Sequence, residues 1–145
     1  MSEAVNAMEK KKARLRVISI MVDQDGDRNE IRNAHTGTCM DDGTTVVLEY
    51  DDVQDGERAR IELTARSGHA QMVRKGMTSA KLVFTPGQRT SSAYVTMYGE
   101  IPVMVDTRQA LVMREENGGD LLLHYDVYVG GEMTARTQLR VTWRV

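Results

Sequence analysis

The sequence predicts an all-β protein, a single antiparallel up-and-down β-barrel of about eight to ten strands. Two observations support this prediction: apolar and polar residues alternate along most of the chain, and turn residues interrupt the alternation at short intervals. Alternation with a period of two places successive side chains on opposite faces of a strand. Short strands separated by regular turns, with no long helical period between them, are typical of all-β barrels and sandwiches.

The last two runs show the alternation most clearly. Five residues from Thr137 to Val145 lie on one face of the final run, and the polar residues Arg140, Thr142 and Arg144 lie on the other. We expect one face of these two runs to be buried, with the following members: Leu121, Leu123, Val127, Leu139, Val141 and Trp143.

Turn signals delimit the other runs. Asp25-Gly26 predicts a hairpin, and Pro86-Gly87 suits a type II turn. Further runs are expected near residues 30–40, 46–50, 58–65, 72–74, 80–84, 89–97, 101–105 and 110–114. Residues 1–14 are expected to form a polar tail or a short helix, and residues 15–145 the barrel domain.

Composition limits the classes of protein. A chain of 145 residues is long enough for one domain with its own core, and its net charge of −2 gives no overall attraction to nucleic acid. The single Cys39 excludes an internal disulfide and fits a reducing compartment. Without an apolar stretch of spanning length or a signal-peptide pattern, we expect a cytoplasmic protein with no membrane partner.

Two groups of residues resemble catalytic or metal sites, but their spacing along the chain does not match that of known sites. Asp23–Asp27 departs from a calcium loop, because Arg28 and Ala34 stand where Gly and Glu are required, so a hairpin turn is expected. His35 and Cys39 share a strand face, but the other histidines lie on separate runs, which argues against a zinc site and against a Cys–His nucleophile. We therefore expect neither an enzyme nor a bound cofactor.

The outer face of the last run carries a basic stripe, Arg136, Arg140 and Arg144, which barrel closure would place near Arg14 and Arg16. Such a stripe could contact an acidic protein or the phosphates of RNA. Charged outer faces also keep sheets soluble, and no exposed aromatic residues are interleaved for base stacking. We expect solvated surface here, and nucleic acid is not the expected partner.

Arg74 shares its parity with Met72 on a short run that ends at Gly76, so we expect it to point into the barrel near one rim. A buried guanidinium needs acceptors, which makes Arg74 either a structural lock or an anion receptor. Tyr94 and Thr96 share one parity, and Tyr125 lies on an inward face. These four residues, Arg74, Tyr94, Thr96 and Tyr125, are the candidate ligand-binding residues.

The same stretch carries a family resemblance through these residues: Met72, Arg74, Gly76, Leu82, Phe84, Gly87, Thr90, Tyr94, Thr96, Tyr98, Gly99, Thr107, Gly119, Leu121, Leu123, Tyr125, Gly130 and Leu139. Together they resemble the YwiB-type family of uncharacterised bacterial β-barrel proteins, a domain-of-unknown-function family with a calycin-like (lipocalin-like) barrel. The resemblance covers about residues 15–145. Met97 departs from the family's pattern, which usually has Pro at this position.

The resemblance implies a calycin-like barrel, a fold that often holds a small, largely apolar ligand. The sequence and the resemblance together favour a non-enzymatic protein that binds a small apolar or amphipathic ligand in the barrel lumen. The alternative is an interaction module that uses Arg136, Arg140 and Arg144 to contact an acidic protein or RNA. Fold-level analogy is a weak basis for choosing a ligand, so the choice depends on the geometry of the lumen.

Overall fold

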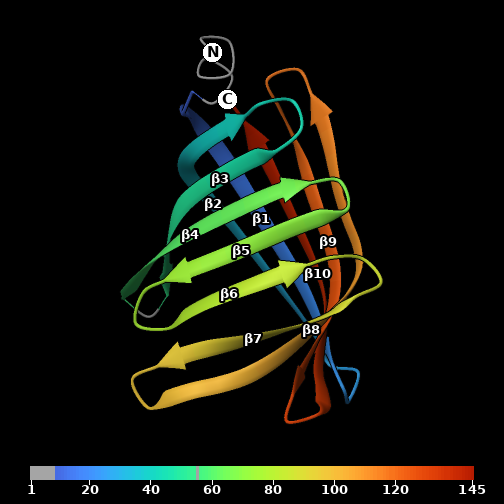
Figure 1. The fold of residues 1–145 in the computed structure, drawn as a ribbon. Helices are drawn as coiled ribbons and strands as arrows, with labels where there is room; N and C mark the ends of the chain where they lie inside the picture. Colours follow the sequence, from blue (N-terminus) through green and yellow to red (C-terminus); the bar gives the residue numbers. More distant parts are fainter. Residues whose placement is uncertain (1–8, 55) are drawn as a thin grey trace.

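The computed structural model describes residues 9–54 and 56–145, and these residues form a closed barrel of ten antiparallel strands (Figure 1). Each strand pairs with its neighbours in sequence, and β1 pairs with β10 to close the barrel. The strands are β1 (Lys11–Asp23), β2 (Arg28–Asp41), β3 (Val46–Gln54), β4 (Glu57–Arg66), β5 (His69–Lys75), β6 (Ser79–Phe84), β7 (Arg89–Thr96), β8 (Gly99–Glu115), β9 (Gly118–Val129) and β10 (Glu132–Arg144). The predicted all-β, up-and-down barrel is thus confirmed. The described residues contain no helix long and apolar enough to cross a membrane.

Two predicted boundaries differ from the structure. β8 is one strand of 17 residues where two separate runs were expected, because a bulge between Thr107 and Gln109 shifts the register and interrupts the alternation without ending the strand. β1 begins at Lys11, so residues 11–14 are strand and not part of a tail. Their pattern of charged residues around the buried Ala13 is too short to reveal a strand by itself. Residues 9 and 10 have no regular secondary structure, and residues 1–8 of the expected tail lie outside the described residues.

The inward-facing residues form one hydrophobic core. Of the six residues expected to be buried in β9 and β10, five are at most 6% exposed, and Val127 is half-buried and packs against them. Arg140 and Arg144 face outward as expected. Each buried leucine contributes about 1.5–3 kcal/mol of transfer free energy, so this face supplies much of the stability of the fold.

The turns follow their sequence signals. In the β1–β2 turn the Asp23 carboxylate accepts hydrogen bonds from the backbone N–H groups of Asp25 and Asp27, both at 2.9 Å, so the predicted hairpin is confirmed. In the β6–β7 turn Gln88 N–H donates to the Thr85 carbonyl at 3.0 Å, and Gly87 has a φ of 79°. A positive φ at the third position is what a type II turn requires.

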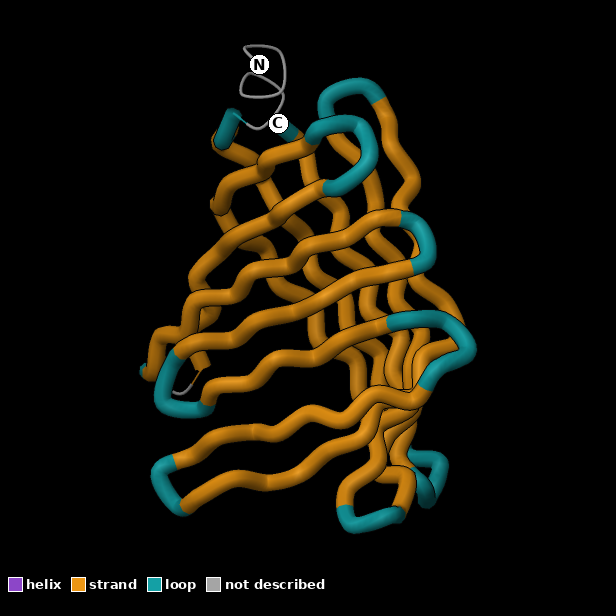
Figure 2. The backbone as a smooth tube through the Cα atoms, in the orientation of Figure 1, coloured by secondary structure: helices purple, strands orange, loops and turns teal. Residues whose placement is uncertain are grey.

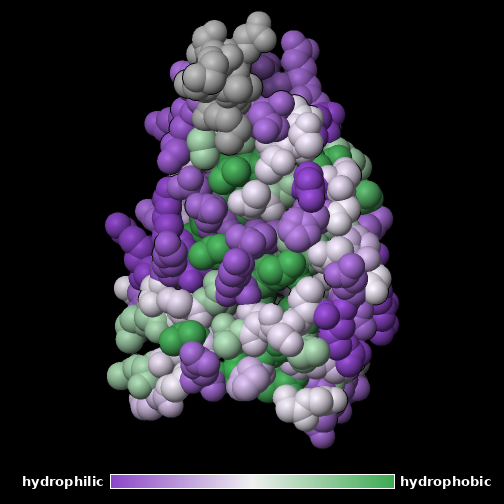
Figure 3. Space-filling view, in the orientation of Figure 1, coloured by the Kyte–Doolittle hydropathy of each residue, from purple (hydrophilic) through white to green (hydrophobic). Residues whose placement is uncertain are grey.

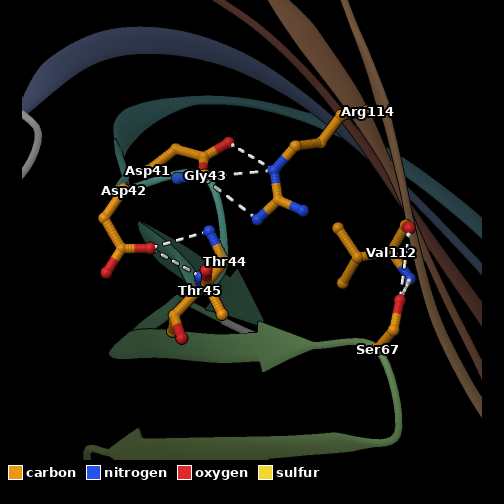
Figure 4. Close-up of polar contacts among 8 residues, drawn as sticks. All are labelled: Asp41, Asp42, Gly43, Thr44, Thr45, Ser67, Val112 and Arg114. Carbon is orange, nitrogen blue, oxygen red and sulfur yellow. Dashed lines mark hydrogen bonds and ion pairs between the residues drawn. The ribbon is translucent and has the colours of Figure 1, made fainter.

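One end of the barrel is closed by turns that pack against the second half of β8. Arg114 forms a two-pronged ion pair with Asp41 at 3.0–3.2 Å, which ties β8 to the β2–β3 turn (Figure 4). The β4–β5 turn is held in the same way, since Gly68 N–H donates to the Ala110 carbonyl at 3.0 Å. These contacts join segments that are far apart in sequence, and they cover the apolar interior at this end.

The opposite end is more open. β2 pairs with β3 only over Thr38–Asp41, and β6 pairs with β7 only at Ser79 and Ala80 (Figure 2). Beyond those pairs, hydroxyl groups of β7 replace the ladder, because Thr90 donates to the Val83 carbonyl at 2.7 Å. β2 and β3 therefore diverge toward this end, whereas β6 and β7 stay paired there and separate toward the β6–β7 turn.

Candidate functional site

A row of inward-facing residues crosses the barrel wall from β3 to β7. In the strand register Tyr50 lies opposite Ile61, Ile61 opposite Arg74, Arg74 opposite Ala80, and Ala80 opposite Tyr94. Residues that are directly opposite in a sheet point to the same face. The register thus brings an arginine and two tyrosines from three separate strands into one row on the lumen side.

Arg74 is paired inside the lumen. Its Nη1 donates to Oδ2 of Asp52 at 3.3 Å, and the two side chains are 24% and 15% exposed. A guanidinium has five N–H donors, and within the described part of the chain this contact with Asp52 is the one side-chain hydrogen bond that Arg74 makes. The pair is therefore a single long contact that uses one of the five donors.

A pocket of about 340 Å³ opens beside Arg74, with a lining of Met72, Arg74, Thr78, Ala80, Leu82 and Tyr94. Most of the lining is apolar, and the guanidinium, the Thr78 hydroxyl and the Tyr94 hydroxyl supply its polar groups. We call this space the lumen pocket. Its volume lies at the lower end of the range for small-molecule sites.

Burial keeps the tyrosines near Arg74 protonated. Burial raises the pKa of Tyr50 to about 12, the Asp52 carboxylate adds to this effect, and Arg74 opposes it. Burial also raises the pKa of Tyr94, again opposed by Arg74. Near neutral pH both hydroxyls are therefore neutral hydrogen-bonding groups, suited to orienting a ligand.

The other two candidate residues, Tyr125 and Thr96, do not line the lumen pocket. Tyr125 is 8% exposed and packs its ring 4.7 Å from that of Phe84, so its ring belongs to the core, and its pKa is raised first by burial and then by the nearby Tyr94. Thr96 lies at the end of β7, where its hydroxyl donates to the Gly99 carbonyl at 2.9 Å and accepts from Tyr98 N–H at 3.1 Å. The structure thus brings Arg74 and Tyr94 together, places Tyr125 in the core and uses Thr96 to shape a turn.

An apolar groove of about 370 Å³ lies outside the barrel mouth, between the β5–β6 and β7–β8 turns. Met77, Met97 and Tyr98 line it, and they are 58%, 73% and 91% exposed. Apolar side chains are visible at the lower left of this face of the molecule, where these turns lie (Figure 3). We call this feature the rim groove. Thr78 lines both the rim groove and the lumen pocket, so the two spaces are neighbours.

The sequence reasoning missed Asp52 and Tyr50. The alternation that places Val46 and Leu48 inward continues to Tyr50 and Asp52, so the sequence alone could have predicted that both side chains point inward. A lone aspartate near a turn resembles solvated surface unless its partner across two strands is known. The register that brings Asp52 to Arg74 is a property of the assembled sheet, and no local pattern encodes it.

Each arginine of the basic stripe pairs with an acidic neighbour, and Asp126 is shared between Arg136 and Arg108. Arg136 pairs with Asp126 at 3.2 Å and Arg140 with Asp120 at 3.1 Å. Arg144 makes a looser pair, 3.7 Å long, with a carboxylate at the end of β8. Burial raises the pKa of Asp120, but hydrogen bonds from Arg140 and Thr142 outweigh it, and the net shift is downward.

The remaining polar candidates do not assemble into a metal or catalytic cluster. The His35 ring stacks on Tyr50 at 4.5 Å, and Cys39 is buried with a pKa raised to about 11, first by burial and then by the nearby Asp41. His69 Nδ1 lies 3.0 Å from the Thr85 hydroxyl, well separated in the sheet from Arg74. No group of three or more potential metal ligands occurs among residues 9–54 and 56–145.

Comparison with known proteins places the chain in a family. Over 126 residues it is 21% identical to the uncharacterized beta-barrel protein YwiB of Bacillus subtilis (strain 168), covering 87% of this chain and 89% of YwiB. The crystal structure of the ywiB protein from Bacillus subtilis is similar in fold, with a TM-score of 0.84 and 23% identity over 97% of this chain and 96% of that one. The profile of a domain of unknown function, DUF1934, matches residues 16–141, so the chain belongs to the DUF1934 family.

Proposed function

We propose that this protein is a non-enzymatic, cytoplasmic binding protein that holds a small amphipathic molecule in the lumen pocket. Arg74 would bind the polar head of the ligand, with Tyr94 as a second polar contact. Met72, Ala80 and Leu82 would contact its apolar part.

The proposal rests on the Arg74 guanidinium, which uses one of its five N–H donors in a hydrogen bond to a protein side chain. A structural lock would be expected to saturate its donors with protein acceptors, whereas Arg74 makes one contact of 3.3 Å to Asp52. The remaining donors lie beside a pocket that is open and largely apolar. An arginine presents a planar fork that matches a carboxylate or a phosphate, so an anionic head group suits this geometry.

The rim groove supports an amphipathic ligand. Met77, Met97 and Tyr98 keep an exposed apolar surface next to the mouth, and Thr78 links this surface to the lumen pocket. Methionine side chains adapt to irregular partners, which suits a ligand of variable shape. A short apolar tail could extend from the pocket along this groove.

A thermal-shift screen with saturated fatty acids of increasing chain length tests the proposal. We expect short or medium chains to raise the melting temperature of the wild-type protein and to leave Arg74→Met unaffected. A charge-assisted contact of about 1.5–3 kcal/mol corresponds to a loss of roughly 10- to 150-fold in affinity. Arg60→Met is the matched control, because Arg60 is an ion-paired arginine on the outer face of the same wall.

Asp52→Asn should change carboxylate affinity in the opposite direction to Arg74→Met. Asp52 competes with an anionic ligand for Arg74, so removing its charge should tighten carboxylate binding. The proposal is wrong if no carboxylate stabilises the wild-type protein, or if Arg74→Met and Arg60→Met respond equally.

A further inference from the structure

The lower half of β2 has an unpaired edge. Residues 28–37 pair with β1 on one side, whereas β3 pairs only from Thr38 onward, and no other described strand pairs with residues 28–37. Ten residues of strand span about 33 Å. A strand edge of this length presents a row of unpaired backbone N–H and C=O groups that can pair with another strand.

The geometry of β2 keeps this edge accessible. Gly37 stands where β2 meets β3, and a Cβ atom there would overlap the Glu49 carbonyl oxygen. Below this close approach the two strands separate: β2 descends to the β1–β2 turn at the bottom of the view, and β3 runs to the left (Figure 1). Residues 28–34 are all exposed.

The sequence of the edge is complementary to itself. Asn29-Glu30-Ile31-Arg32-Asn33 is symmetric about Ile31 in size and polarity and antisymmetric in charge. When two copies run antiparallel with Ile31 opposite Ile31, each Glu30 lies opposite Arg32 of the second copy. Each Asn29 then lies opposite Asn33 of the second copy. Opposite charges on directly facing residues stabilise strand pairs, and like charges destabilise them.

Both faces of the strand fit this register. Glu30 and Arg32 lie on the outer face, where they already form a 3.1 Å ion pair within one chain, so each has the reach to meet its counterpart across a new pair. Ile31 is 36% exposed on the other face and would bury that surface against its own copy. An isologous contact of this kind has two-fold symmetry and closes at two subunits.

We propose that the β2 edge binds the same edge of a second copy of this chain, in antiparallel register centred on Ile31. The sheet then continues from one barrel into the other. A strand pair of this length buries less area than a standard permanent interface, so the dimer is concentration dependent. Charge complementarity between residues 30 and 32 selects the second copy as the partner.

Sedimentation equilibrium from about 10 μM to about 1 mM protein covers the range of weak and moderate dissociation constants. We expect the wild-type protein to dimerise in this range. Glu30→Arg and Arg32→Glu each place like charges opposite one another, so each variant alone should associate about tenfold or more weakly.

A mixture of the two variants is the decisive test of the proposed register. A Glu30→Arg chain and an Arg32→Glu chain present opposite charges to one another, so their mixture should recover dimers that neither forms alone. The double swap, Glu30→Arg with Arg32→Glu in one chain, restores self-complementarity and should dimerise like the wild type. Both positions concerned are exposed, so circular dichroism should show unchanged folding. A wild-type monomer at the highest concentration, or a mixture that behaves like its components, would overturn the proposal.

Discussion

The two ends of the barrel are built differently. At the closed end Trp143, Leu15 and Leu121 are at most 1% exposed, and the Arg114–Asp41 ion pair holds a turn over them. At the open end an ion pair and tyrosines occupy the lumen beside a pocket. Dense apolar packing supplies stability at the closed end, whereas the lumen at the open end is less tightly packed and retains polar groups. Stability is thus assigned to the closed end of the barrel, and the proposed binding site lies at the open end.

Removing the aromatic residue at the closed end should have the largest effect. Trp143 packs over Gly119 so closely that a Cβ at Gly119 would lie 2.7 Å from its ring. Trp143→Ala should lower the free energy of unfolding by about 3–5 kcal/mol, because the cavity cannot collapse in a closed barrel. Met21→Ala at the open end, where the side chain is half-buried, should cost about 1 kcal/mol or less. Similar costs in urea melts would contradict the assignment of stability to the closed end.

The junction between the two ends depends on a glycine. Gly37→Ala would drive a methyl group into the Glu49 carbonyl and force β2 and β3 apart, so we expect a loss of about 1–3 kcal/mol. Thr36→Ala, one residue away on the exposed face, should change stability by less than about 0.5 kcal/mol. Hydrogen exchange at the Thr38–Asp41 pairs would show whether the loss is local to the junction. Equal melting of both variants would mean that the close approach at Gly37 relaxes freely.

High pH should weaken the open end through Tyr50. Its pKa in the folded protein is about 12, against an ordinary value of 10.0, so the unfolded chain loses this proton first. Stability from Tyr50 is therefore complete below pH 10 and is lost as the pH rises toward 12, by about 1 kcal/mol at pH 11. Cys39, with a pKa of about 11, acts in the same direction. Tyr50→Phe should remove the tyrosine share of the alkaline loss, as measured by urea melts at pH 9 and pH 11.

The sequence was sufficient to predict the strands and the inward faces, because alternation is local. It located Arg74 and Tyr94 on the lumen side for the same reason. It did not distinguish them from Tyr125, whose ring packs in the core, or from Thr96, which shapes a turn, since parity gives a direction but not a depth along the barrel. Asp52 was missed because its partner is fixed by the strand register. The break predicted within β8 was a bulge, which interrupts alternation without ending a strand.

The smallest expected effect concerns the outer face of β10, where polyanion binding would add a second binding surface to the one proposed at the open end. Arg136 and Arg140 are held by Asp126 and Asp120, so neither has its full charge to offer a phosphate. We expect heparin or single-stranded RNA to bind too weakly to measure at low salt. If all three arginines of the basic stripe were free to contact phosphates, a plot of log K for polyanion association against log salt concentration would have a slope of about −2 to −3.

If heparin or RNA does bind, variants in a basic groove beside the stripe can show where it binds. A space of about 570 Å³ lies between Lys12, Arg14 and Arg144, and Arg14 faces Arg144 directly across the β1–β10 pair. Like charges that face each other raise the local attraction for anions, unlike the closer ion pairs of Arg136 and Arg140. Arg14→Ala should therefore abolish any salt-dependent binding, whereas Arg140→Ala should leave it nearly unchanged. A larger effect of Arg140→Ala would show that the ion pair with Asp120 opens readily, and the outer wall would then join the open end as a second binding surface.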